Sequence, residues 1–297
     1  NRPPHKVIQF FLKFLLTKLH RLLHGLGMVI NKLSLSSLLI VGSCLSSSAA
    51  LLADFSGGGL PYAEGGLRNA PVAAGQVLSG GPSGDYYHLL DGAEGSAGNY
   101  VSVSSGASTA GWQSAIFTMD FRADRIQADG FGVAFLDSAI HGTSGVVQAG
   151  TTGAADVEER GQYSNSIGVG FRTFNGTNAT AFYNGVESPD AAYSITAGQW
   201  GSMEITLDRD AASGDVLLNA NTYSGTSLSG TASNVFTDYA IPGVTMEEFR
   251  MQISGRTGGA AMDLDIDNLS LIVNVPEPAT SLLAGLSLLA LGVRRRR

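Results

Sequence analysis

The sequence predicts an all-β fold, a sandwich of two antiparallel sheets built from one domain. Three observations support this prediction. Apolar and polar residues alternate over short runs, glycine-containing turn pairs separate these runs, and no amphipathic helix of ordinary length occurs between residues 53 and 274. Only 14% of the 297 residues are charged and 39 are Gly, a composition typical of short strands and tight turns. All-β sandwiches of about 200–250 residues commonly form a single unit.

Seven runs have the alternation expected of strands with one buried face. They cover residues 114–121, 131–136, 167–174, 202–207, 216–223, 249–254 and 264–273. Turn signals lie between them at Asp129-Gly130, Asn175-Gly176, Asn184-Gly185, Ser213-Gly214 and Gly258-Gly259. The longest region without strand alternation is 142–163, and loops of that length on a sandwich are either functional or mobile.

The charge of the central region restricts its partners. Residues 51–276 contain 24 acidic residues, eight Arg and no Lys, which gives a net charge of −16 with His neutral. Nucleic acid and anionic lipid repel such a chain, so neutral polymers and cations are the expected partners. Cys44 lies before this region, which therefore has neither a disulfide nor a Cys/His zinc cluster. His88 and His141 are expected to be isolated surface residues.

The first 50 residues contain six basic residues and no acid. Residues 7–23 are basic and apolar at helical spacing, which fits either a membrane-surface helix or an extension upstream of the true start. We favour an extension over residues 1–27, because a better start follows at Met28. Residues 28–50 then form a signal peptide, with Lys32, an apolar run and small residues before a cleavage point near Ala50.

The last 23 residues, 275–297, have a different organisation from the predicted sandwich at 51–274. Pro276 and Pro278 keep the junction extended, and an apolar run, 279–293, would form a helix of about 22 Å, short for a bilayer of roughly 30 Å. The order of a Pro-Glu-Pro sequence, a short apolar helix and a basic cluster closely resembles the PEP-CTERM sorting signal. The resemblance implies a transmembrane sorting helix, recognition by an exosortase (a membrane-embedded cysteine protease), cleavage near the motif, and a final place at the cell surface or outside the cell. An ordinary C-terminal anchor is the alternative. The residues that carry the resemblance are Pro276, Glu277, Pro278, Arg294, Arg295, Arg296 and Arg297.

Three segments of the central region together resemble the legume-type lectins of the concanavalin A-like fold. They are ADGFGVAF at 128–135, IGVGFRTFN at 167–175 and the long segment 249–271; the strand WGSMEITLD at 200–208 also fits. The resemblance spans about Trp112 to Val273 and implies a jelly-roll sandwich. It also implies that Asp129 accepts hydrogen bonds from sugar hydroxyls, with Asn175 and Gly259 as further contacts. Asp129 and Asn175 each precede a Gly, so a role as turn residues is the alternative for both.

The chain departs from the lectins where they bind metal. The lectin strand supplies Glu and Asp, whereas this chain has Gly170 and Arg172, and Arg offers only hydrogen-bond donors. The standard calcium and transition-metal pair, which preorganises the sugar site in legume lectins, is therefore not expected.

A second acidic set lies near the end of the predicted sandwich. Asp263, Asp265 and Asp267 alternate, so they share one face of a strand, and Ca²⁺ binds oxygen ligands of this kind. Their spacing of about 7 Å along the strand is too wide for one ion without a loop ligand. We therefore favour a solvated acidic face, expect no cofactor, and keep Ca²⁺ at this row as a weaker candidate.

No catalytic pattern appears in the sequence. The E-x-D-x-(x)-E strand of glucanases of this fold is absent, Glu204 stands alone in its run, and there is no G-x-S-x-G elbow. The sequence therefore predicts a non-enzymatic, exported surface or matrix protein that binds exopolysaccharide without the standard metal site. A purely structural component of a biofilm or envelope and a divergent polysaccharide hydrolase are the alternatives.

Overall fold

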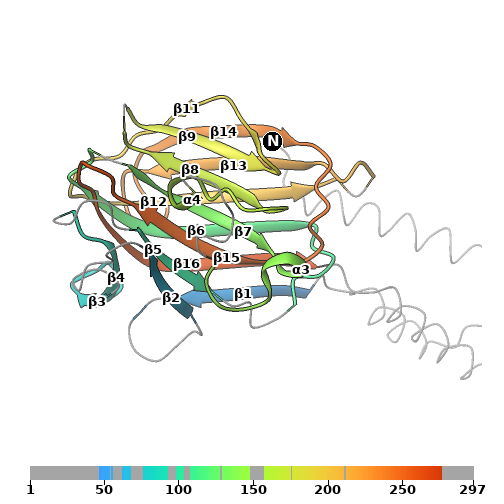
Figure 1. Ribbon diagram of the computed structural model, residues 1–297, viewed down its shortest axis with the longest axis horizontal. Helices are drawn as coiled ribbons and strands as arrows, with labels where there is room; N and C mark the ends of the chain where they lie inside the picture. The colour runs from blue at the N-terminus through green and yellow to red at the C-terminus, as the bar shows by residue number, and fades with distance from the viewer. Residues whose placement is uncertain are drawn as a thin grey trace, which may run out of the picture. The chain divides into compact units, whose positions relative to one another are not determined.

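The structure is a computed structural model that describes residues 47–53, 55, 62–67, 76–92, 98–103, 108–127, 129–147, 157–174, 176–210 and 212–275. These residues belong to one compact unit, Ser46–Pro276. Two antiparallel sheets form this unit, and their strands run in similar directions (Figure 1). The prediction of an all-β sandwich is confirmed.

The first sheet, called the β6 sheet, has the order β14-β13-β12-β6-β16-β4-β3, and β1 pairs with the second half of β16. Its strands are β1 (Ser47–Ala53), β3 (Gln76–Ser79), β4 (Asp85–Leu90), β6 (Ser114–Asp124), β12 (Trp200–Arg209), β13 (Val216–Tyr223), β14 (Ala232–Ile241) and β16 (Asp263–Val275). Ser47 lies opposite Val275, so the two ends of the described unit meet. The cleavage point expected near Ala50 falls inside β1.

The second sheet, called the β7 sheet, has the order β10-β9-β8-β7-β15-β5-β2, with β11 also paired to β9. Its strands are β2 (Tyr62–Leu67), β5 (Gly98–Val103), β7 (Gly130–Asp137), β8 (Ile167–Arg172), β9 (Asn178–Tyr183), β10 (Val186–Glu187), β11 (Ala191–Ala192) and β15 (Phe249–Arg256). The chain crosses between the sheets repeatedly, including from β4 to β5, from β5 to β6, from β6 to β7, from β11 to β12, and on either side of β15.

Aromatic and aliphatic side chains fill the space between the sheets. Alternate residues of β6 and β12 are buried there, and so are alternate residues of β7 and the apolar residues of β8 and β15. Ala134 and Leu136 of β7 instead form a separate small cluster with Tyr163. Phe131 stacks on Phe171 with ring centroids 5.1 Å apart and contacts Phe121 of the other sheet at 5.6 Å. This burial of large rings is the main stabilising contribution of the fold.

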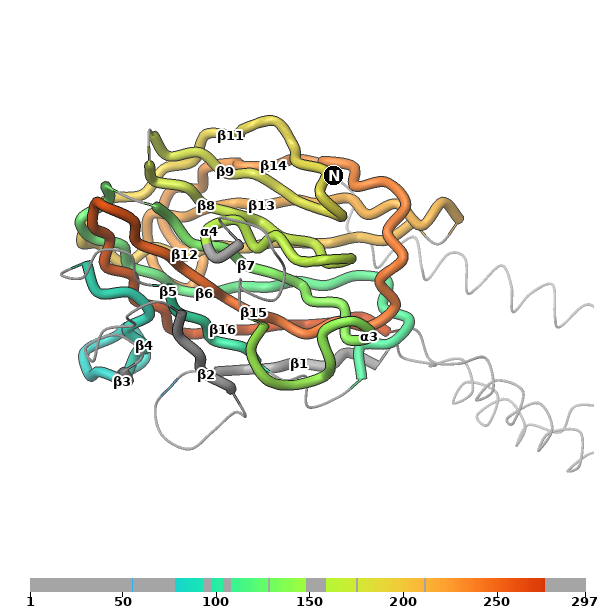
Figure 2. The backbone as a smooth tube through the Cα atoms, in the orientation of Figure 1, coloured from blue at the N-terminus to red at the C-terminus, as the bar shows by residue number. Residues whose placement is uncertain are grey.

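Two short helices, α3 (Ser138–His141) and α4 (Val157–Arg160), follow β7. The Asp137 side chain caps α3 by accepting a hydrogen bond from Ala139 N at 2.9 Å. Beyond α3 the chain folds back over β15 (Figure 2), where the fully buried Arg250 donates to the carbonyls of His141 and Gly142. Burial lowers the pKa of the Arg250 guanidinium.

Within the described residues, no helix has the length and apolar character needed to cross a membrane. The expected sorting helix at 279–293, the flanking Pro276-Glu277-Pro278 and Arg294–Arg297, and the predicted signal segment before residue 47 lie outside those residues.

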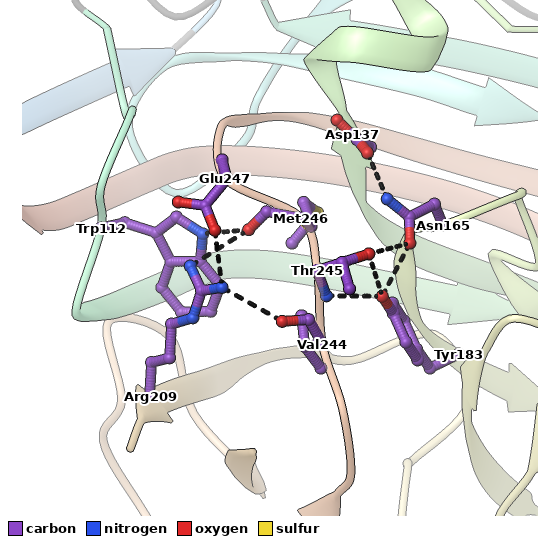
Figure 3. A network of polar contacts seen from close by, with 9 residues as sticks. All are labelled: Trp112, Asp137, Asn165, Tyr183, Arg209, Val244, Thr245, Met246 and Glu247. Atoms are coloured by element: carbon purple, nitrogen blue, oxygen red, sulfur yellow. Dashed lines mark hydrogen bonds and ion pairs between the residues drawn. The ribbon is translucent and has the colours of Figure 1, made fainter. Parts of the chain in front are cut away.

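A polar network fixes the crossover from β14 to β15 (Figure 3). Asn165 Oδ1 accepts hydrogen bonds from Tyr183 Oη at 2.7 Å and Thr245 Oγ1 at 2.9 Å, and Asn165 Nδ2 donates to Asp137. Arg209 donates to the carbonyls of residues 244 and 246, and its guanidinium carbon lies 5.4 Å from the centre of the Trp112 ring. The crossover is thereby held to both sheets at the α3 end of the sandwich.

Six of the seven predicted runs lie within strands, and the seventh, 167–174, extends two residues beyond the end of β8 at Arg172. Two of the strands that were not predicted, β5 and β9, lack alternation for a physical reason. Every residue of β5 is buried and five of the six residues of β9 are buried, so both faces are covered and no polar face appears in the sequence. Asn184-Gly185 forms the β9–β10 hairpin with both φ angles positive, as predicted. Asp129-Gly130 is not a hairpin, because β6 and β7 belong to different sheets and Asp129 has no positive φ.

Candidate functional site

Asp129 lies in the crossover from β6 to β7, where three loops meet at one end of the sandwich. Its carbonyl oxygen accepts hydrogen bonds from Thr173 N at 2.9 Å and Phe174 N at 3.4 Å, and its own N–H donates to Arg256 O at 3.0 Å. The crossover is therefore bonded both to the end of β8 and to the end of β15. This is the end opposite α3 (Figure 1).

Gly130 allows this close approach. Its φ is +151°, and a Cβ at this position would lie 2.3 Å from the carbonyl oxygen of Phe171. Any side chain would force β7 away from β8, so the Asp-Gly pair serves strand packing rather than a hairpin turn.

The carboxylate of Asp129 is placed by the loop between β15 and β16. Arg256 Nε lies 3.0 Å from Asp129 Oδ2. A Cβ on Gly258 would lie 2.7 Å from the same oxygen, so the glycine backbone passes directly against the carboxylate. The next residue, Gly259, is exposed, and a Cβ there would meet nothing within 4 Å. Asp129 and Gly259 therefore belong to one surface.

The third loop brings an aromatic ring that sequence reasoning missed. Phe174 is 56% exposed, although it follows directly on the buried Thr173. Asn175, the residue predicted from the lectin pattern, lies outside the described residues, but Phe174 and Gly176 on either side of it are both exposed. The break in alternation at Thr173-Phe174 was the available signal. We call the surface formed by Asp129, Phe174, Arg256, Gly258 and Gly259 the rim.

The two positions that carry metal ligands in the lectin pattern have other roles in this chain. A Cβ on Gly170 would lie 2.6 Å from the Cα of Arg160, so the backbone of α4 occupies the space where a ligand side chain would stand. Arg172 instead forms an ion pair with Asp190, 2.6 Å between Nη2 and Oδ1. In the described part of the chain no three His, Cys, Asp or Glu side chains gather as a metal site. The residues present do not fit the lectin metal pair.

Arg256 forms an ion pair with the Asp129 carboxylate. Its Nη1 also lies 4.0 Å from Glu159 Oε2, and the neighbouring Arg160 pairs with Glu187 at 3.4 Å. Alternating charges therefore link the rim to α4 and the β9–β10 hairpin. The side chain of Arg256 is 23% exposed and that of Asp129 15%, so the pair is only weakly screened.

The predicted acidic row of Asp263, Asp265 and Asp267 is not a solvated face. Asp265 is 5% exposed and Asp267 is fully buried. Asp265 contacts His88 Nδ1 at 2.6 Å and Arg122 Nε at 2.8 Å, and Asp267 accepts hydrogen bonds from Ser83. Each carboxylate has its own partners on neighbouring segments, and Asp263 likewise accepts from Gly92 N and pairs with Arg125. The expectation of a solvent-screened row is therefore wrong, since hydrogen-bond donors and cations of the protein, rather than solvent, surround these carboxylates.

His88 also differs from its expected role as an isolated surface residue. Its side chain is 15% exposed, and the hydrogen bond with Asp265 raises the pKa of its imidazole above the ordinary 6.5. Arg122, on the other side of Asp265, lies between the rings of Tyr86 and Trp200, 5.2 and 5.0 Å from their centres. Four neighbouring strands of the β6 sheet, β4, β16, β6 and β12, thus contribute His88, Asp265, Arg122 and Trp200 in turn.

Comparison with known proteins supports both the tail and the fold. Residues 274–297 match the family described as the PEP-CTERM protein-sorting motif. The motif indicates export and sorting by an exosortase. No curated protein matches the sequence.

The structure is similar to those of legume lectins. Lectin II from Ulex europaeus superposes with a TM-score of 0.54 at 12% identity, covering 76% of this chain and 98% of the lectin. Peanut lectin bound to a nine-residue peptide gives 0.53 at 13% identity, covering 77% and 98%. The lectin UEA-II complexed with galactose gives 0.50 at 12% identity, covering 76% and 98%. At these identities the similarity establishes the fold, a legume-lectin-like jelly roll.

Proposed function

We propose that this chain is a non-catalytic carbohydrate-binding protein of the cell surface or extracellular matrix, and that its rim binds the sugar. The observation that carries the proposal is the convergence of Asp129, Phe174 and the Gly258-Gly259 loop from three separate loops, β6–β7, β8–β9 and β15–β16. A binding site needs convergent polar groups and an apolar surface, and the rim has both. Exopolysaccharide outside the cell is the proposed ligand, since the sorting motif indicates export.

The chemistry of the rim suits a sugar ring. A carboxylate accepts hydrogen bonds from vicinal hydroxyls, and the exposed face of Phe174 can pack on the C–H face of a pyranose. Gly259 leaves the approach open, because no side chain stands there. Arg256 orients the carboxylate, a task that a metal pair performs in the legume lectins.

A glycan array probed with the purified chain tests this proposal. Phe174→Ala should weaken binding to the best glycan about tenfold or more, because it removes the apolar platform. Asp129→Asn should have an effect of similar size. The matched control is Ile140→Ala, which removes an apolar side chain of 54% exposure at the opposite end of the sandwich and should bind like the unaltered chain.

Equal binding by Phe174→Ala, Asp129→Asn and the control would contradict the proposed site. Absence of binding to every glycan, together with loss of matrix cohesion on deletion of the protein, would favour the structural alternative. The hydrolase alternative has less support, because Glu204 of β12 lies opposite Thr118 and Asn221 rather than a second carboxylate. Release of reducing ends from bacterial polysaccharides would nevertheless revive it.

A further inference from the structure

A cavity separate from the rim lies at the same end of the sandwich. It is about 340 Å³ in volume and is formed where β12 begins, where β13 ends and where β14 begins, under the segment 194–199. Its walls include Phe121 and Ala123, both buried, and Gly201. The volume falls within the range of small-molecule sites, about 300–1,000 Å³.

Gly201 keeps the wall of the cavity open. A Cβ at this position would lie 2.7 Å from the carbonyl oxygen of Tyr223 and 3.9 Å from the tip of the Phe121 ring. Any larger residue would displace the β13 backbone or project toward that ring. The hollow therefore depends on the absence of a side chain at a strand position.

The segment over the cavity is fixed at both of its ends. Tyr193, which is buried, donates from its hydroxyl to Arg172 O at 3.1 Å and accepts at its carbonyl from Thr177 Oγ1 at 2.9 Å. Gly198 N donates to Ala123 O at 2.9 Å. The cavity is therefore preformed, and its covering segment is bonded to the same β8–β9 loop that carries Phe174 of the rim.

The chemistry of the lining is neutral and rich in hydroxyls. None of the 14 lining residues is Asp, Glu, Lys, Arg or His. Seven of them carry a hydroxyl, and Gln199 carries an amide, whereas Phe121, Ala123 and Ile195 are apolar. Hydroxyl and amide groups both donate and accept hydrogen bonds, so they match the hydroxyls of a sugar and leave no charge to be compensated. Near the segment that covers the cavity, a Cβ on Gly198 would lie 3.9 Å from an oxygen of Asp124, a carboxylate that would repel an anionic ligand.

We infer that this cavity is a second glycosyl subsite, which takes a neutral sugar residue of a chain whose other residue lies on the rim. This inference rests on the proposed function of the rim and deepens it by naming a class of ligand, a neutral oligosaccharide rather than a uronate or a single sugar. Two subsites joined by one ligand give a higher affinity than either alone, because the second contact is made at high local concentration.

Ser233 offers a test that leaves the rim intact. It pairs with Thr222, which is buried, so both side chains point toward the cavity side of the sheet. Ser233→Leu should fill the cavity. The control is Asn234→Leu, one residue further on β14, where the side chain points to the other face of the sheet. Thermal melting of both variants verifies that they fold.

The experiment is calorimetric titration of the full chain with neutral gluco-, galacto- and manno-configured hexasaccharides, with their monosaccharides, and with an oligogalacturonate. We expect the best hexasaccharide to bind about tenfold or more tightly than its monosaccharide. Ser233→Leu should abolish that gain while monosaccharide binding persists, and Asn234→Leu should keep the gain.

The inference would be overturned if Ser233→Leu kept the higher affinity for the hexasaccharide over the monosaccharide. It would also be overturned if the oligogalacturonate bound with the same affinity as the neutral hexasaccharides. The experiment distinguishes failure of the proposed rim site from failure of the proposed cavity subsite. Binding that is lost in Ser233→Leu but unaltered in Phe174→Ala would reject the rim and keep the cavity. Binding lost in Phe174→Ala, with no preference for longer sugars, would reject the cavity and keep the rim.

Discussion

At the level of single residues, the proposed sugar site depends on the contact between Asp129 and Arg256. In the legume-lectin pattern a metal pair organises the sugar site, but Gly170 and Arg172 offer no metal ligand. Under the proposed function, the ion pair of Asp129 with Arg256 orients the carboxylate instead. The ion pair also explains why Gly258 is a glycine, since a side chain there would collide with the carboxylate. Carbohydrate binding by this chain should therefore depend on an arginine rather than on a cation from solution.

A chelator experiment follows from this arrangement. Treatment with EDTA should leave glycan affinity unchanged, whereas Arg256→Gln should lower it about tenfold because Asp129 loses its partner. The measurement is titration calorimetry on the best glycan, with Arg125→Gln as a control whose side chain is 55% exposed. Loss of binding in EDTA, restored by Ca²⁺, would show that a metal organises the site after all.

His88 gives a prediction about pH. The hydrogen bond and charge of Asp265, together with the charges of Asp91 and Asp263, raise the pKa of His88 in the folded state above 6.5, against the opposing effect of burial. Protonated His88 is thus favoured by folding. Its stabilising contribution is full below pH 6.5 and is lost as pH rises through the folded-state pKa.

Urea denaturation at about pH 6 and about pH 8 measures this linkage. The unaltered chain should lose more stability across that interval than His88→Gln, in which the titrating group is absent. An identical pH dependence of the two proteins would mean that the contact of His88 with Asp265 does not persist in solution.

At the scale of elements, the crossover from β14 to β15 joins the two sheets through side chains rather than strand pairing. Asn165 has a positive φ of 49° and bonds to Asp137, Tyr183 and Thr245, so one residue connects three segments (Figure 3). Asn tolerates this backbone conformation better than most residues, and its amide supplies both a donor and an acceptor.

Asn165→Ala should destabilise the fold by about 2 kcal/mol, because buried hydrogen-bonding groups lose their partner and the residue keeps a strained φ. Chemical denaturation against Asn234→Ala, an exposed Asn of β14, measures the difference. Glycan binding should be retained, since the network lies at the α3 end. A stability equal to that of the control would contradict the role of the network.

The sequence predicted elements with alternating residues, and two of the strands it missed, β5 and β9, are covered on both faces. β6, β12, β13 and β16 each show one polar face, whereas β5 and β9 are buried on both sides and carry no alternation. The site was predictable in part. Asp129 and Gly259 were found through their motif, but Phe174 and Arg256 act through contacts between distant segments, which no local pattern records.

At the scale of the whole molecule, the sandwich and the sorting tail are continuous in sequence. β16 ends at Val275, and Pro276 of the Pro-Glu-Pro sequence follows it directly, so the matched motif, 274–297, overlaps the last two residues of the strand. Proline cannot continue a strand ladder, so the fold ends where the expected processing site begins. The −16 charge of residues 51–276 and the neutral lining of the cavity favour uncharged polymers as ligands.

The central claim is that one end of the sandwich, at the rim, binds a sugar. The most direct measurement is a backbone amide NMR titration of the chain with the best glycan from the array. We expect the largest shifts at Asp129-Gly130, Thr173-Phe174 and Gly258-Gly259, with no change at Asn165 or in α3. Shifts centred on the α3 end, or none at saturating glycan, would contradict it.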